Sequence, residues 1–140
     1  VSDLGDGTQG ILAVQTKCHE KMHREVPKPI RLARYREIAQ RSGVVKPDAI
    51  DAIGTDHTVM WLDHLLMLSM LQHPSGAWGW GRCVVLHPAG NADFADLCAR
   101  YRELLVDDST FSSMTVEALL DAKALPPKTT KALRERYVLG

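Results

Sequence analysis

The sequence predicts a single mixed α/β domain, residues 1–140, and three observations support this fold class. Two strand-like segments flank the glycine-rich stretch GDGTQG, residues 5–10. Segments with helical spacing of apolar residues follow, and RCVVLH, residues 82–87, is typical of a strand covered on both faces. At 140 residues the chain has the length of one domain and can bury a core without a metal or a disulfide.

The first two elements are expected to form a hairpin, with residues 1–4 and 11–18 as its strands. Side chains alternate between the faces of a strand. One face of the second strand therefore carries Leu12, Val14, Thr16 and Cys18, and the other carries Ile11, Ala13, Gln15 and Lys17. We expect the first of these faces to be core throughout, and the second to turn polar only at its end.

Helices are expected over the rest of the chain, except for the strand at 82–87. Pro29 and Gly43 bound a helix over 30–41, a shorter helical piece covers 46–54, and an apolar, buried helix starts at 55 or 56 and runs to 72. Asn91 caps a helix reaching about 106, and two short C-terminal helices follow, one capped by Thr115. Asp63 and His64 lie inside the apolar helix, where we expect hydrogen-bonded structural roles; the alternative is that they line a cleft.

Composition favours a cytoplasmic protein without a membrane anchor. Lys and Arg total 17, as do Asp and Glu, so net charge implies no particular class of partner. Cys18, Cys83 and Cys98 form no C-x-x-C pair, which fits a reducing compartment. The longest apolar stretch, residues 59–71, is too short for a membrane span. The chain does not begin with Met, so an N-terminally truncated domain is an alternative, with residues that complete its site before Val1.

Residues 19–23, HEKMH, match the H-E-x-x-H pattern of zinc proteases. That chemistry needs both histidines one turn apart on a regular helix, together with a third ligand. The preceding residues are strand-like, Pro27 and Pro29 follow closely, and the third histidine of the extended signature is missing. A zinc hydrolase using His19, Glu20 and His23 is therefore the weakest alternative.

Gln15 and Lys17 indicate a different chemistry, metal-dependent phosphodiester hydrolysis. This reaction needs oxygen ligands for a hard divalent cation and a positive group to orient the attacking water. Residues two apart on a strand project from the same face, as Gln15 and Lys17 do. Asp3, or Asp6 in the turn, and the Thr16 carbonyl would complete the metal site, giving the layout D…(D/E)-x-K.

Several motifs are spread along the chain, namely VQTKCHE (14–20), the Arg34-Tyr35 pair, WLDHLL (61–66), HPAGN (87–91), TFSSMTVEALL (110–120) and LRERYVL (133–139). Together they resemble a bacterial nuclease-like group of the PD-(D/E)xK nuclease superfamily. The resemblance covers nearly the whole chain. It implies a restriction-endonuclease-like fold, in which helices flank a mixed central β-sheet.

Carried over residue by residue, the resemblance implies a Mg²⁺- or Mn²⁺-dependent deoxyribonuclease. Lys17 would be the catalytic lysine, Glu20 the second acid, and Gln15 would occupy the metal-binding acid position beside Asp3 and Thr16. An amide oxygen still coordinates a cation but brings no negative charge. A native Q-x-K enzyme, a disabling replacement of glutamate, and a fold retained for binding all remain open.

Local charge supports DNA as the partner. Nine Lys or Arg residues between Lys17 and Lys46 face only three glutamates. Such a patch positions a duplex through its phosphates without reading its sequence. The expected contacts are Lys21, Arg24, Arg31 and Arg36. A merely solvated helix face and a non-catalytic nucleic-acid-binding or protein-interaction module on the same fold are the alternatives that remain open. A homodimer is compatible with this interpretation.

Overall fold

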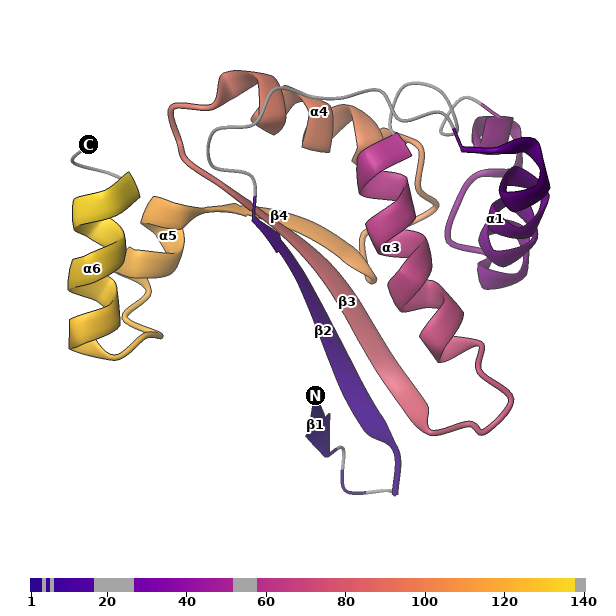
Figure 1. Cartoon of the computed structure of the whole chain (residues 1–140), viewed down its shortest axis with the longest axis horizontal. Helices are drawn as coiled ribbons and strands as arrows, with labels where there is room; N and C mark the ends of the chain where they lie inside the picture. The colour runs from indigo at the N-terminus through magenta and orange to yellow at the C-terminus, as the bar shows by residue number, and fades with distance from the viewer. Residues whose placement is uncertain (4, 6, 17–26, 52–57, 138–140) are drawn as a thin grey trace.

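The computed structural model describes residues 1–3, 5, 7–16, 27–51 and 58–137, and it confirms the mixed α/β class (Figure 1). Its elements in chain order are β1 (Ser2–Asp3), β2 (Gln9–Thr16), α1 (Pro29–Ser42), the 3₁₀ helix η1 (Pro47–Ala49), α3 (Thr58–Leu71), β3 (Trp78–His87), α4 (Ala92–Glu103), β4 (Phe111–Thr115), α5 (Val116–Asp121) and α6 (Pro127–Tyr137).

One four-stranded sheet has the order β1-β2-β3-β4. The short strand β1 pairs antiparallel with β2, as the predicted hairpin requires, while β2, β3 and β4 run parallel. The register places Thr16 beside Leu86 and His87 beside Thr115. The carboxyl ends of the three parallel strands therefore meet at one edge, which we call the C-terminal edge of the sheet.

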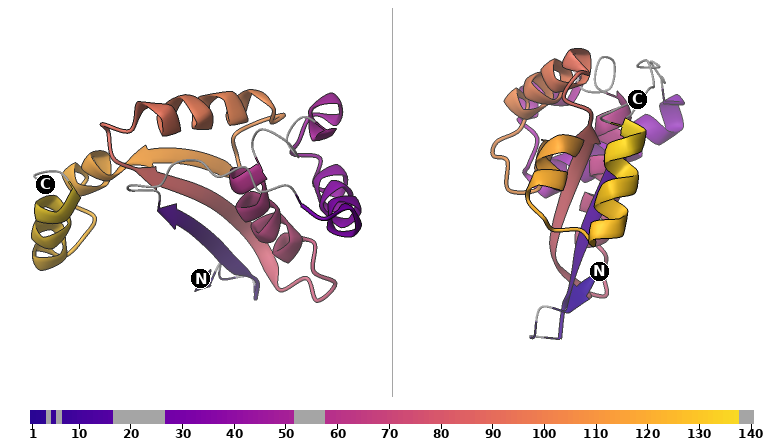
Figure 2. Two further views of the ribbon diagram at one scale, coloured as in Figure 1. Left: turned by 45° about the horizontal axis from the view of Figure 1, so that its top comes forward. Right: turned by 90° about the vertical axis from the view of Figure 1, so that its left-hand side faces the viewer.

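Helices α3 and α4 cover the same face of the sheet (Figure 2). His64 of α3 lies 5.5 Å from Phe111 of β4 between ring centroids, and Tyr101 of α4 lies 4.8 Å from the same ring. Phe111 is paired with Cys83 of β3, and both side chains are fully buried. The core therefore lies between α3, α4 and this face, and α1 packs on the outer side of α3 through Ile38 and Tyr35.

The face of β2 that was expected to be core is instead exposed. Leu12 and Val14 are 52% and 51% exposed, whereas Ile11 and Ala13 pack against the core. Trp80 of β3 and Met114 of β4 are exposed as well. Within residues 82–87, Cys83, Val85 and His87 are buried, whereas Arg82, Val84 and Leu86 on the other face are half-buried, so the expected cover is complete on one face and partial on the other. Both faces of these strands carry apolar side chains, and alternation alone does not say which face α3 and α4 will cover.

Local signals predicted the helices well. Pro29 begins α1, and Gly43 ends it in the left-handed conformation at φ 65°. The Asn91 side chain accepts a hydrogen bond from the Phe94 amide, and the Thr115 hydroxyl accepts one from Ala118, so both expected caps are confirmed. Among the described residues, no helix is both long and apolar enough to cross a membrane.

Gly81 allows α3 to approach the sheet closely. A Cβ atom at this position would overlap the Met67 sulfur and would lie only 3.0 Å from Ile11 and 3.2 Å from Leu71. We expect Gly81→Ala to lower the free energy of unfolding by about 1–3 kcal/mol, because the packed interface must shift. Urea unfolding checks this, with Gly90→Ala as the control because a Cβ there meets nothing within 4 Å. Equal stability of the two variants would contradict the tight packing.

Candidate active site

Side chains from three strands gather at the C-terminal edge of the sheet. Gln15 and Thr16 end β2, beside Val85 and Leu86 of β3. His87 ends β3, is 4% exposed, and its Nδ1 lies 3.0 Å from the Pro88 carbonyl oxygen. Because parallel strands carry ligand sites beyond their carboxyl ends, this edge is the natural place to look for function.

Gln15 has the most unusual environment at this edge. Its side chain is half-buried on the face that α3 and α4 cover, and its Oε1 atom is shielded from solvent and has no hydrogen-bond partner among the residues that the structure describes. Such an unsatisfied buried acceptor costs about 1–3 kcal/mol. Native proteins rarely keep such a group unless it has a use, such as binding an ion. An amide oxygen is a suitable ligand for a hard divalent cation.

The structure does not bring Asp3 to Gln15, so the expected metal set of Asp3, Gln15 and Thr16 is not assembled. Asp3 pairs with Gln9, six positions before Gln15 along β2, which corresponds to about 20 Å. Its carboxylate accepts a hydrogen bond from the Gly5 amide within the turn. Asp3 precedes the hairpin turn directly, so its partner on β2 is the residue that follows the turn directly, Gln9. Continued along β2, the same register would place the partner of Gln15 before Val1.

Several expected site residues lie outside the described residues. They are Lys17, Glu20, Lys21 and Arg24, with His19 and His23 of the zinc alternative. Their roles stay predictions. Within the described part of the chain, no group of three or more His, Cys, Asp or Glu side chains could hold a metal ion.

Arg31 and Arg36, the other expected DNA contacts, are on α1. This helix lies beyond α3, away from the C-terminal edge of the sheet (Figure 1). Arg36 forms an ion pair with Asp51 at 2.7 Å, and Arg31 is exposed.

Other arginines of α1 are also balanced by acids of the chain. Arg34 and Arg41 both pair with Glu37, at 2.8 and 3.7 Å. The hydrogen bond and charge of Arg34 lower the pKa of Glu37. The basic character of α1 is thus smaller than the sequence count suggests.

His64 has a structural role, as expected. Its Nδ1 lies 3.0 Å from the Tyr101 hydroxyl and its Nε2 lies 2.9 Å from the Thr110 hydroxyl, so both ring nitrogens are hydrogen-bonded in the core. Burial lowers the pKa of His64 to about 4. The neighbouring Asp63 lines a cavity of about 310 Å³ between α1 and α3, together with Tyr35 and Leu66.

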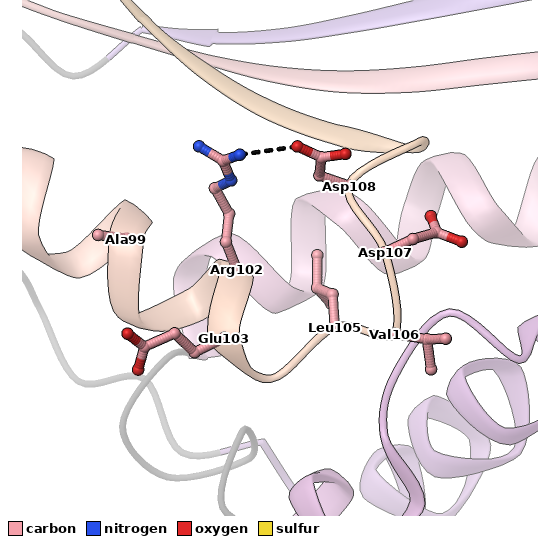
Figure 3. A pocket seen from close by; sticks show the side chains of 7 residues that line it. All are labelled: Ala99, Arg102, Glu103, Leu105, Val106, Asp107 and Asp108. Atoms are coloured by element: carbon pink, nitrogen blue, oxygen red, sulfur yellow. Dashed lines mark hydrogen bonds and ion pairs between the residues drawn. The ribbon is translucent and has the colours of Figure 1, made fainter.

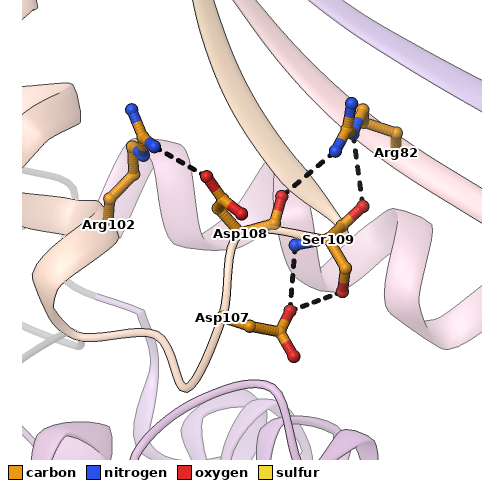
Figure 4. A network of polar contacts seen from close by, with 5 residues as sticks. All are labelled: Arg82, Arg102, Asp107, Asp108 and Ser109. Atoms are coloured by element: carbon orange, nitrogen blue, oxygen red, sulfur yellow. Dashed lines mark hydrogen bonds and ion pairs between the residues drawn. The ribbon is translucent and has the colours of Figure 1, made fainter.

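A second polar network, which the sequence did not reveal, ties β3 and α4 to the loop before β4. Figure 4 shows Arg82 donating to the backbone oxygens of Asp108 and Ser109, while Arg102 pairs with the Asp108 carboxylate at 2.7 Å. Ser109 donates from its hydroxyl and its amide to Asp107, which lowers the pKa of Asp107. These partners are satisfied within the network, which indicates a structural role.

The same loop borders a cavity of about 460 Å³ (Figure 3). Its wall includes Arg102, Glu103 and Leu105, and the Arg102–Asp108 ion pair closes one side. The loop precedes Phe111 at the start of β4, whereas the C-terminal edge lies at the other end of that strand. This cavity is therefore separate from Gln15.

Comparison with known proteins now decides the family. A family model described as the PD-(D/E)XK nuclease superfamily matches residues 2–139. The chain belongs to the PD-(D/E)XK nuclease superfamily. Searches of curated proteins and of solved structures gave no significant match. Membership indicates a nuclease and a nucleic-acid substrate, and nucleases of this superfamily typically use divalent metals.

The environment of Gln15 is suited to one ligand of the divalent metal that nucleases of this superfamily typically use. The buried Oε1 of Gln15, which no described residue partners, is a hard oxygen at the position where the D…(D/E)-x-K layout places an acid, two residues before Lys17. What is missing is negative charge, because an amide is neutral. A cation held here would consequently bind more weakly than at a carboxylate.

Proposed function

We propose that the protein is a divalent-metal-dependent nuclease that hydrolyses DNA phosphodiester bonds at the C-terminal edge of its sheet. The observation that supports this most directly is the buried Oε1 atom of Gln15, which has no hydrogen-bond partner in the described part of the chain. It lies at the end of β2, immediately before Thr16 and Lys17, in a chain of which residues 2–139 match a nuclease superfamily.

In this proposal each residue has a distinct role. The Gln15 amide oxygen and the Thr16 carbonyl would hold Mg²⁺ or Mn²⁺, whereas Asp3 lies too far along the hairpin to be a ligand. When bound there, the cation would supply charge to offset that of the phosphate and would lower the pKa of a coordinated water. Lys17 orients the attacking water, and Glu20 assists in proton transfer.

Lys17→Ala is expected to lower plasmid nicking by about 100-fold or more, because a positioned charged group at the reacting centre typically contributes that much. The assay compares Mg²⁺, Mn²⁺ and EDTA. Lys28→Ala is the control, since it removes the same charge from an exposed lysine. Nicking by Lys17→Ala at the rate of the unaltered chain, or cleavage in EDTA, would contradict the proposal.

A non-catalytic binding module on the same fold is the second candidate. It is favoured by the neutral side chain at Gln15 and by the lack of a three-acid cluster in the described part of the chain. Such a module would bind DNA with the same affinity in Mg²⁺ and in EDTA, and would cut in neither.

A further inference from the structure

The C-terminal helices form a projecting arm, which we define as α5 and α6, residues 116–137. Figures 1 and 2 show both helices beyond the end of β4, at the opposite end of the molecule from α1 and α3. Val116 and Leu120 anchor α5, whereas α6 has no buried residue. A helix without a buried face contributes little to the stability of the core. All sides of α6 are therefore at least partly accessible to a binding partner.

This surface carries unbalanced positive charge. The arm contains five basic residues, Lys123, Lys128, Lys131, Arg134 and Arg136, against three acids, Glu117, Asp121 and Glu135. Lys123 and Lys128 make no ion pair with any residue that the structure describes, and Lys131 makes a long ion pair of 3.9 Å with Glu135. The arginines of α1, in contrast, are largely paired.

Three of these cations converge on one hollow. A cavity of about 510 Å³ lies between α5 and α6, and Lys123, Lys131 and Arg134 line it together with Leu120 and Leu125. Arg134 also contacts Asp121 at 3.2 Å. Cations gathered around a concave surface raise the local potential for an anion more than the same charges scattered over a helix.

The root of the arm is fixed at the C-terminal edge of the sheet. Thr115 is paired with His87 and caps α5 through the Ala118 amide. Glu117 accepts a hydrogen bond of 2.9 Å from the Ala89 amide, in the loop that follows β3. The arm therefore starts at the same edge as Gln15, and a polymer that reaches this edge would extend along it.

We propose that the α5–α6 arm binds the phosphate backbone of the DNA substrate and holds the duplex against the C-terminal edge. This inference rests on the proposed function. Phosphate contacts by lysine release counterions, so they give affinity that falls steeply with salt and carries no sequence preference. The arm, rather than α1, is then the principal DNA-binding surface of the described chain.

The test compares two triple variants with the same change in net charge. One is Lys123→Gln/Lys128→Gln/Lys131→Gln, and the control is Arg34→Gln/Arg41→Gln/Arg100→Gln, which removes paired cations from α1 and α4. Affinity for a duplex oligonucleotide is measured in EDTA between 50 and about 200 mM salt. We expect the arm variant to bind at least about tenfold more weakly, with a salt slope smaller by about two to three, and the control to change less than about twofold.

The outcomes separate the arm from the catalytic proposal. Equal weakening of both variants, or no binding by the unaltered chain, overturns the arm. If the arm variant binds with unchanged affinity while Lys17→Ala abolishes nicking, the proposal for the arm is wrong and the nuclease proposal stands. Loss of affinity in the arm variant of a protein that cuts under neither metal supports the arm and overturns the nuclease. Thermal unfolding of both variants verifies that the fold is intact.

Discussion

Gln15→Glu is expected to make the stability of the protein depend on divalent metal and to raise its nicking rate. The Oε1 atom of Gln15 is shielded from solvent and has no partner among residues 1–3, 5, 7–16, 27–51 and 58–137, so a carboxylate there would lose hydration without gaining a hydrogen bond from them. Without metal, the free energy of unfolding should fall by about 1–3 kcal/mol. A cation at about 100 times its dissociation constant would restore about 2.7 kcal/mol.

The nicking rate of Gln15→Glu should rise about tenfold or more at low Mg²⁺, because a carboxylate adds the charge that the amide lacks. Thermal unfolding with and without Mn²⁺ measures the first effect, and plasmid nicking measures the second. Gln15→Glu/Lys17→Ala should keep the metal-dependent stability and lose cleavage. This result would distinguish the metal-binding role of position 15 from the catalytic role of Lys17. A Gln15→Glu protein whose unfolding ignores metal would show that this position holds no cation.

Gln15→Met is the matched control for this experiment. Methionine has nearly the length of glutamine, so it removes the polar atoms with little change in packing. Because the buried oxygen is unsatisfied, we expect stability to stay the same or to rise by about 1 kcal/mol, with no response to Mn²⁺ and no nicking. Gain of stability with loss of activity is the pattern expected of a residue kept for function. Strong destabilisation would instead show that Oε1 has a structural partner.

The contrast between α1 and β4 shows which elements sequence could predict. Helix α1 has a proline at its start and a glycine at its end, and both act locally, so its bounds were nearly correct. Strand β4, FSSMT, is short, and its serines are typical of loops; only pairing with β3 makes it a strand, so it was missed. The glycines of Trp78–Gly81 likewise suggested a break, although β3 begins at Trp78 and pairs with β2 there. Gly81 is needed within the strand because α3 packs closely against it.

The candidate site divides in the same way. The whole-chain motifs correctly indicated the nuclease superfamily. That Gln15 and Lys17 share a face is expected from strand geometry and stays a prediction, because Lys17 lies outside the described residues. The partner of Gln15 across the hairpin depends on register, which the turn fixes, and the turn holds Asp3 near Gln9. The basic character of α1 is also smaller than its arginine count, because Arg34 and Arg41 pair with Glu37 of the same helix and Arg36 pairs with Asp51 outside it. Only the pair with Asp51 depends on the folding of the chain beyond helical spacing.

His64 is expected to make the protein sensitive to mild acid. Burial lowers the pKa of His64 to about 4, from an ordinary value near 6.5. Between these pH values the unfolded chain binds a proton that the folded protein excludes, so stability is complete above about pH 6.5 and is lost as pH falls toward 4. The loss should approach about 3 kcal/mol over this window, and about 2 kcal/mol by pH 5.

Urea unfolding at pH 7.5, 6 and 5 measures this loss, and His64→Gln isolates its source. The variant should be less stable at pH 7.5, because glutamine cannot reach both Tyr101 and Thr110 with the geometry of the ring. Its stability should nevertheless change less between pH 7.5 and 5, because the excluded proton is gone. His73→Gln, at an exposed histidine, should keep the full dependence. If His64→Gln keeps it as well, the acid sensitivity belongs to other groups, and the ring of His64 accepts its proton within the folded core.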